Sequence, residues 1–248
     1  MLATITRKKE LLDSFKPFPT ALEKNLYTLA RNELTYASNA LEGNTLTNSQ
    51  TAIIIEKGIV IDGKTLVEHL DVVGHAQAVD FIKELAGHIT HATLTAEHLV
   101  MLHRYIVGAS DSVSAWMLGR IADSDAGPHL SQHNALKIPE LMEEFMASIN
   151  VSTEPPALLA ARAHLQLMFI PSFVDGNGST GRLLMNFLLL QAGYPLTVID
   201  SELRDEYIEC IENALLYEKP EPFYNFIYRA IDKSLDNYLD ALNNPERV

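Results

Sequence analysis

The stretch DGNG at residues 175–178 has the composition of a loop that binds phosphate. Glycines permit backbone conformations in which successive N–H groups point at one anion. A helix expected from about Thr180 adds the positive end of its dipole. Arg182 is expected in the first turn of this helix, where its planar guanidinium can bind two phosphate oxygens. Asp175 is a candidate ligand for a magnesium ion that bridges phosphates.

The alternative is a plain glycine-rich turn between two core helices, because short glycine motifs are weak signals. No general base accompanies the loop. Pro171 stands in front of it and offers neither a lone pair for a proton nor an N–H, and Ser172 cannot act as a base unaided. His164 is expected to pack or hydrogen-bond within the core. His129 and His133 could approach the site across a cleft, but they are expected to be solvated loop residues.

Helical periodicity dominates the elements that must position these residues. Apolar residues at spacings of three and four predict a helix over residues 20–42, and Gly43 ends it. The segment 108–134, rich in Ser, Asp and Gly, is expected to be long and irregular, with a short hairpin. Further helices are expected at about 48–58, 65–86, 95–107, 139–149, 156–169, 180–192, 200–217 and 220–243. The expected fold class is all-α.

Composition narrows the range of functions. The net charge of −13 disfavours a general nucleic-acid-binding protein, because phosphate neutralisation needs clustered Lys and Arg. A single cysteine, Cys210, excludes an internal disulfide and a cysteine-built zinc site. No apolar run approaches the roughly 20 residues needed to span a bilayer, and the N-terminus lacks the apolar core of a signal peptide. We therefore expect a cytoplasmic protein that binds neither nucleic acid nor membrane.

The loop and its surroundings resemble the Fic (Fic/Doc or Fido) family, whose signature is His-x-Phe-x-Asp/Glu-Gly-Asn-Gly-Arg-x-x-Arg. The matching positions are Phe173, Asp175, Gly176, Asn177, Gly178 and Arg182. HLQLMF before the loop, RLLMNFLLLQAGYP after it, GKTLVEHLDVVGHAQAVDFI and IPELMEEF also look like Fic segments in the family's order. The resemblance covers roughly residues 35–230 and implies a Fic-type helical bundle with a short β-hairpin flap.

The resemblance implies the transfer of AMP from ATP to a hydroxyl side chain of a target protein. It assigns Mg²⁺ to Asp175, the phosphates to Gly176, Asn177 and Gly178, and the γ-phosphate to Arg182. A flap within residues 115–132 would register the target segment beside the nucleotide. These roles are expectations carried over from the family.

The departures from the signature imply impaired catalysis. Pro171 occupies the position of the family's histidine, which takes the proton from the target hydroxyl, and Ser179 replaces the first arginine. A positioned general base typically contributes a factor of about 10²–10⁴. Loss of a charge-assisted hydrogen bond costs about 1.5–3 kcal/mol, so triphosphate binding should weaken without vanishing. At the adenine end, Tyr207 matches one member of an aromatic pair, and Ile208 replaces the other.

An N-terminal segment, SNALEGN, resembles the family's inhibitory motif Ser/Thr-x-x-x-Glu-Gly/Asn. Ser38, Glu42 and Gly43 match it. In autoinhibited relatives the glutamate pairs with the last signature arginine and competes with the γ-phosphate, so the resemblance implies a Glu42–Arg182 pair here. The alternative is that Glu42 merely ends a helix beside solvent.

Three regions are expected along the chain. Residues 1–90 form an N-terminal helical region with the inhibitory helix at 20–43. Residues 91–218 form the Fic core, with the flap at about 115–132 and the signature loop at 171–182, and residues 219–248 form a C-terminal helix that packs on it. The expected function is an autoinhibited and weakened protein adenylyltransferase that uses ATP and Mg²⁺. The alternative is a non-catalytic protein that binds nucleotide or phosphate, or a regulatory partner, and a homodimer is possible.

Overall fold

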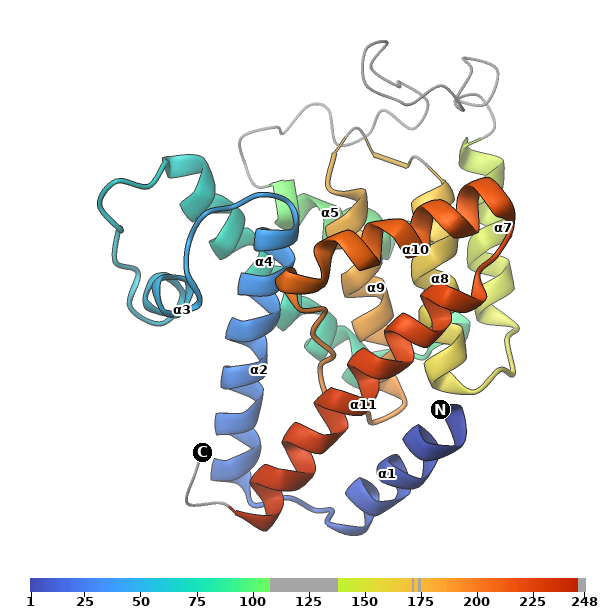
Figure 1. The fold of residues 1–248 in the computed structure, drawn as a ribbon, viewed down its shortest axis with the longest axis horizontal. Coiled ribbons are helices and arrows are strands. Elements are labelled where there is room, and N and C mark those ends of the chain that lie inside the picture. The colour runs from blue at the N-terminus through green and yellow to red at the C-terminus, as the bar shows by residue number, and fades with distance from the viewer. Residues whose placement is uncertain (108–137, 171, 174, 245–248) are drawn as a thin grey trace.

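A computed structural model describes residues 1–107, 138–170, 172, 173 and 175–244 (Figure 1). Over these residues the protein is all-α, as predicted, and none of them lies in a β-strand. The hairpin flap expected at about 115–132 lies outside the described residues, as do Pro171, His129 and His133. The described helices are α1 (Leu2–Ser14), α2 (Thr20–Leu41), α3 (Asn48–Lys57), α4 (Leu66–His88), α5 (Ala96–Val107), α7 (Ile138–Asn150), α8 (Pro156–Phe169), α9 (Asn177–Gln191), α10 (Arg204–Tyr217) and α11 (Glu221–Asn243), with 3-10 turns at His91–Thr93 and Ser201–Leu203.

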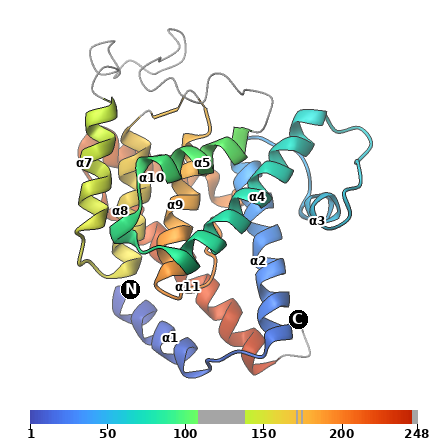
Figure 2. The ribbon, with the colours of Figure 1, turned by 180° about the vertical axis from the view of Figure 1, so that it is seen from behind.

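Helix α9 is the centre of the fold, and α4, α5 and α8 pack around it (Figures 1 and 2). Every residue from Ser179 to Leu189 is buried, as expected for a helix that is apolar on nearly all sides. Asn186 is a fully buried polar residue of this helix. Its amide donates to the carbonyls of Arg182 and Thr197, both at 3.0 Å, and accepts from the Thr197 N–H at 2.7 Å. It therefore ties the chain after α9 back onto the central helix.

Helix α2 positions the N-terminal side of the site. It packs on α4, and its C-terminal end lies beside the N-terminal end of α9 (Figure 1). Side-chain caps fix the neighbouring helices, because Thr47 with Gln50 and Thr65 with Glu68 form capping boxes at the starts of α3 and α4. The backbone and hydroxyl groups of Thr45 and Thr65 lower the pKa of Glu68 to about 2. Thr45 and Glu68 therefore bond the loop after α2 to the start of α4.

The two ends of the chain pack together. Helix α1 lies along α11, and Lys8 forms ion pairs with Asp232 and Asp236, both at 2.7 Å (Figure 2). One hydrophobic core includes residues from all three expected regions, from Ile5 in α1 to Leu239 in α11. Among the described residues, no helix is both long enough and apolar enough to cross a membrane.

Two helix starts differ from the sequence predictions. Helix α9 begins at Asn177 rather than near Thr180, so Arg182 lies in the second turn and not in the first. The reason is that Gly176, with φ +75°, forms the N-cap, and the Thr180 N–H and hydroxyl both donate to its carbonyl. The α-helix predicted from residue 200 begins at Arg204, after a 3-10 turn.

Candidate functional site

The phosphate-like loop is held by its own side chains. The Asn177 amide donates to the Phe173 carbonyl at 2.8 Å and accepts from the Phe173 N–H at 3.2 Å. The His103 ring stacks on Phe173 with centroids 3.7 Å apart, and its Nε2 lies 2.9 Å from the Asp175 carbonyl. Because a carbonyl only accepts, Nε2 carries the proton, and the lone pair of His103 lies on its buried Nδ1. The conformation of the loop is therefore fixed by Asn177 from within and by His103 of α5 from outside.

Arg182 lies beneath the loop and is 2% exposed. Its Nε donates to the Ser38 hydroxyl at 3.0 Å, and its Nη2 donates to the Ser38 carbonyl at 3.2 Å. The same Nη2 lies 2.6 Å from Glu42 Oε1 and 2.9 Å from the Ser179 hydroxyl. The predicted Glu42–Arg182 contact is thus present. Groups on two helices, α2 and α9, accept hydrogen bonds from this guanidinium.

Ser179 takes part in this cluster although it replaces a signature arginine. Its hydroxyl lies 3.4 Å from that of Ser38, and the Ser179 side chain is buried. The Glu42 carboxylate crosses the first turn of α9, because a Cβ placed on Gly178 would lie 2.5 Å from Glu42 Oε1. The carboxylate therefore occupies the positive end of the helix dipole, the position that suits a phosphate.

Burial and the charge of Arg182 together set the pKa values of the groups around it. Burial alone would lower the pKa of Arg182, but its contacts with Tyr207 and Glu42 outweigh burial and raise it. Burial, reinforced by the charge of Arg182, lowers the pKa values of His75 and His164 to about 3. Both histidines are therefore neutral at pH 7. His164 Nε2 lies 2.9 Å from the Tyr207 hydroxyl, which confirms its predicted place in a core hydrogen bond.

A cavity of about 330 Å³ opens beside the loop, lined by residues of α2, α4, α5 and α9. Asp175, Asp71 and Glu42 contribute carboxylates to it. Burial raises the pKa of Asp71, and the charges of Asp175 and Glu68 raise it further. Within the described ranges, neither Asp71 nor Asp175 forms an ion pair. These two acidic side chains suit a divalent cation.

The described residues include no group of three or more His, Cys, Asp or Glu arranged to hold a metal ion. Mg²⁺ is commonly bound by one or two carboxylates, with phosphate oxygens and water completing its shell. The donor set at this cavity therefore fits Mg²⁺ that arrives with a phosphate ligand better than a permanently bound metal.

Comparison with known proteins decides the family. The model of the Fic/DOC family matches residues 93–189. Protein adenylyltransferase Fic of Drosophila erecta is 32% identical over 251 residues, which cover 98% of this chain and 50% of that protein. The protein of the same name from Nematostella vectensis is 32% identical over 246 residues, covering 96% and 56% respectively.

The chain belongs to the Fic/DOC family.

Solved Fic structures share the whole fold. The chain matches residues 134–508 of Fic-1 from C. elegans with a TM-score of 0.83 and 29% identity, over 97% of this chain and 70% of that one. A Fic domain containing signaling protein from Bacteroides thetaiotaomicron matches with a TM-score of 0.82 and 24% identity, over 97% of this chain and 98% of that one. The chain spans about half the length of the curated Fic relatives that it matches.

The structure brings most of the Fic positions named from the sequence to one place. Glu42, Asp175 and Gly176 line the same cavity, and Ser38 and Arg182 lie beneath it. Gly43 has a φ of +94° just after α2, where it turns the chain away from the loop. Pro171, at the position of the signature histidine, lies outside the described residues.

Sequence reasoning missed two residues of the Fic site. His103 fixes the backbone carbonyl of Asp175, and Asp71 adds a second carboxylate to the cavity. His103 lies 72 residues from Asp175 in the chain, and it carries no local motif. The only signal in the sequence was a histidine within a predicted apolar helix, and such a histidine more often packs in a core. Both residues become visible only when α4 and α5 pack against α9.

Two glycines within α9 give the first testable prediction, because their surroundings differ. A Cβ at Gly181 would lie 2.8 Å from Cδ2 of the fully buried His164 ring, which has no room to move. A Cβ at Gly178 would lie 2.5 Å from Glu42 Oε1 and 3.0 Å from Arg182 Nη1, both at the ends of flexible side chains. Gly181→Ala should therefore destabilise the protein by about 1–3 kcal/mol. Gly178→Ala should destabilise it less, because the Glu42 carboxylate can shift while it stays bonded to Arg182 and because alanine favours the helix. Urea unfolding of both variants measures this difference, and equal losses of stability would contradict it.

Proposed function

We propose that this chain is a Fic-type protein adenylyltransferase that is held closed by Glu42 and impaired in AMP transfer. The observation that carries the proposal is the 2.6 Å contact between Arg182 Nη2 and Glu42 Oε1 above the first turn of α9. The guanidinium that would bind the γ-phosphate is already paired with a carboxylate. The relatives named protein adenylyltransferase Fic support the reaction class.

The chemistry of the proposed reaction requires a triphosphate at the loop. Arg182 and the backbone of Gly176 and Gly178 would bind its phosphates, and Asp175 would hold Mg²⁺, which neutralises the charge that develops on the leaving pyrophosphate. The Glu42 carboxylate competes for the same positive groups. A nucleotide must therefore displace Glu42 before its γ-phosphate reaches Arg182. This competition is the proposed autoinhibition.

The proposed impairment rests on the missing base. Pro171 cannot accept the proton of a target hydroxyl. Of the histidines near the loop, His103 is stacked on Phe173, its protonated Nε2 faces a carbonyl, and burial lowers its pKa. His75 and His164 are buried against Arg182. None of these three described histidines presents a lone pair at the mouth of the cavity.

A second candidate function is non-catalytic binding of a nucleotide or another phosphate compound. Ser179 favours it, because a buried hydroxyl bonded to Arg182 stands where a second phosphate-binding cation is expected. Only the first proposal, AMP transfer, requires a target protein segment that the flap aligns beside the nucleotide. Residues 115–132, where that flap is expected, lie outside the described residues.

Nucleotide binding tests the closed arrangement. Glu42→Ala should tighten binding of Mg-ATP by about tenfold to a hundredfold, because a charge-assisted contact worth about 1.5–3 kcal/mol no longer competes with the γ-phosphate. Isothermal titration calorimetry measures the affinity. Glu212→Ala, which removes an exposed glutamate of α10, is the matched control and should bind like the unmodified chain. Equal affinities for the Glu42→Ala variant and the control would contradict the proposal.

For the partner, we propose that a second copy covers an aliphatic surface on α4 and the loop before it. Val60, Leu66 and Val67 are 78%, 73% and 65% exposed, and neighbouring Leu70 is 45% exposed. Grouped exposed apolar side chains mark interaction sites. Leu66→Asp should raise the dissociation constant of the dimer at least about tenfold in analytical ultracentrifugation. Leu141→Asp, at an exposed position of α7, should leave the dissociation constant unchanged, and a monomeric unmodified chain would contradict the proposal.

A further inference from the structure

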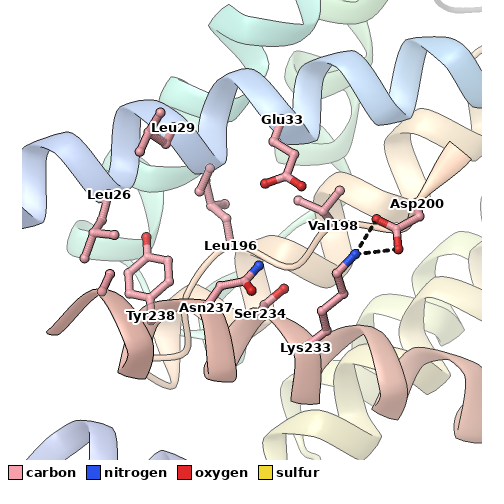
Figure 3. Close-up of a pocket in the computed structure, with 12 residues that line it drawn as sticks. Leu26, Leu29, Glu33, Leu196, Val198, Asp200, Lys233, Ser234, Asn237 and Tyr238 are labelled. Carbon is pink, nitrogen blue, oxygen red and sulfur yellow. Dashed lines mark hydrogen bonds and ion pairs between the residues drawn. The ribbon is translucent and has the colours of Figure 1, made fainter. Parts of the chain in front are cut away.

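A second cavity lies between α2 and α11, away from the phosphate loop (Figure 3). Its volume is about 190 Å³, and the segment 196–200 that follows α9 closes its inner side. Leu26, Leu196 and Val198 give it apolar walls, and the Tyr238 ring borders it. Its described lining shares no residue with the cavity beside Asp175.

One carboxylate faces this cavity without a partner. Glu33 projects from α2 toward α11 in Figure 3 and forms no ion pair or hydrogen bond with any described residue. The nearest cation, Lys233, is already committed, because its ammonium donates to both carboxylate oxygens of Asp200 at 3.0 and 2.7 Å. Burial raises the pKa of Glu33, Lys233 opposes that shift, and the charge of Asp200 adds to it. The cavity therefore carries a net negative charge and one unused strong acceptor.

The hydroxyl of Ser234 adds a second unused polar group. Ser234 on α11 lines the cavity and is 7% exposed, and its hydroxyl has no hydrogen-bond partner among the residues that the structure describes. Figure 3 shows Ser234 and the neighbouring Asn237 on the α11 side of the space that Glu33 faces. Because Ser234 lines the cavity, its hydroxyl is available there both to accept a hydrogen bond from a ligand and to donate one.

We propose that this cavity binds a small primary ammonium compound with a short aliphatic body. Its ammonium donates to the Glu33 carboxylate and the Ser234 hydroxyl, and its carbon chain packs on Leu26, Leu29 and Leu196. A neutral or anionic compound of the same shape leaves Glu33 without a counter-charge. The volume lies below the roughly 300–1,000 Å³ of pockets for drug-sized ligands, so the occupant is small.

Occupancy of this cavity has a consequence for the phosphate loop, and this step rests on the proposed function. The cavity wall formed by Leu26, Leu29 and Glu33 belongs to α2, the helix that carries Ser38 toward Arg182. A ligand that contacts both α2 and α11 holds α2 in its closed position. Mg-ATP must displace Glu42 at the end of α2, so a compound that holds α2 closed lowers the affinity for Mg-ATP. Because coupling between two sites is reciprocal, Mg-ATP lowers the affinity for the ammonium compound by the same factor.

Calorimetry with n-pentylammonium, 1-pentanol and pentanoate tests the site directly. We expect binding of the ammonium compound alone, and an approximately tenfold to hundredfold loss of affinity in Glu33→Gln, as for a lost charge-assisted hydrogen bond. Ser234→Ala should lose less, and Glu212→Gln should bind like the unmodified chain. Glu33 has no partner to lose, so Glu33→Gln should fold normally, with an unchanged melting temperature. No binding of n-pentylammonium, or equal binding of 1-pentanol, overturns the proposal.

The coupling is tested separately, by titrating Mg-ATP into the Glu42→Ala variant and the unmodified chain with and without saturating n-pentylammonium. A several-fold lower affinity for Mg-ATP in the unmodified chain supports the coupling. Ammonium binding with an unchanged affinity for Mg-ATP overturns the coupling and leaves the site standing. Failure of Mg-ATP to bind either protein overturns the proposed function, while the direct titration still decides the ammonium site.

Discussion

A variant that combines Pro171→His, Ser179→Arg and Glu42→Ala should label a protein substrate with AMP about 10²–10⁴ times faster than the unmodified chain. The histidine supplies a base for the target hydroxyl, and the arginine supplies a second cation for the phosphates. Removal of Glu42 takes away the carboxylate that competes with the γ-phosphate for Arg182 Nη2, which lies 2.6 Å from it. Incubation with labelled ATP and Mg²⁺, followed by gel autoradiography of self-labelled protein, measures the rate.

The matched control for this restoration carries Pro171→Ala and Ser179→Ala together with Glu42→Ala. This control substitutes the same three residues without adding a base or a cation. It should label with AMP no faster than Glu42→Ala alone. Robust labelling by the unmodified chain or by Glu42→Ala would show that another residue supplies the base. That result would refute the proposed impairment, whereas labelling only after restoration would support it.

Removal of Glu42 should also destabilise the fold. Arg182 is buried, and loss of its counter-charge leaves a cation bonded to the neutral groups of Ser38, Ser179 and Tyr207. Breaking a buried pair typically costs about 3–5 kcal/mol. Half of the Glu42 side chain is exposed, so water enters when it is lost, and we expect about 3 kcal/mol for Glu42→Ala in urea unfolding at pH 7.

A double-mutant cycle separates the pair from other effects of the substitution. In an Arg182→Met background no buried cation remains, so Glu42→Ala should change the free energy of unfolding by less than about 0.5 kcal/mol, as at an ordinary surface position. An equal loss in both backgrounds would mean that Glu42 acts through the end of α2 and not through Arg182. Saturating Mg-ATP at about a hundred times its dissociation constant should return about 2.7 kcal/mol to the Glu42→Ala variant.

Strong helical periodicity made several bounds predictable from the sequence. The helices expected at 20–42 and 156–169 correspond to Thr20–Leu41 and Pro156–Phe169. Helix α1 was missed because it has no side-chain cap and buries few residues, one of them the stem of Lys9. The start of α9 was misplaced because Gly178 was assigned to the loop. In the structure both Gly178 and Gly181 lie within the helix, where Glu42 approaches the first and His164 the second.

The site was predictable only in part, and for a different reason. Asp175, Gly176 and Arg182 share a local motif, and the partnership of Glu42 with Arg182 was expected from the family resemblance. The role of Ser179 as a hydrogen-bond acceptor for Arg182, and the support of the loop by His103, depend on packing between helices far apart in sequence. Such contacts leave no periodic trace in a single sequence, because any polar residue at those positions has the same local pattern.

The main-chain carbonyl of Ser38 is one of the groups bonded to Arg182, and no substitution at position 38 that preserves the helix removes it. The hydrogen bonds that hold the guanidinium are consequently redundant, because a backbone group and several side chains share them. A single substitution in α2 will remove some of these hydrogen bonds and leave the others in place. Full release of Arg182 requires the whole C-terminal end of α2 to move. A partner that binds and displaces the backbone near Gly43 would therefore release Arg182 more completely than the loss of any one side chain.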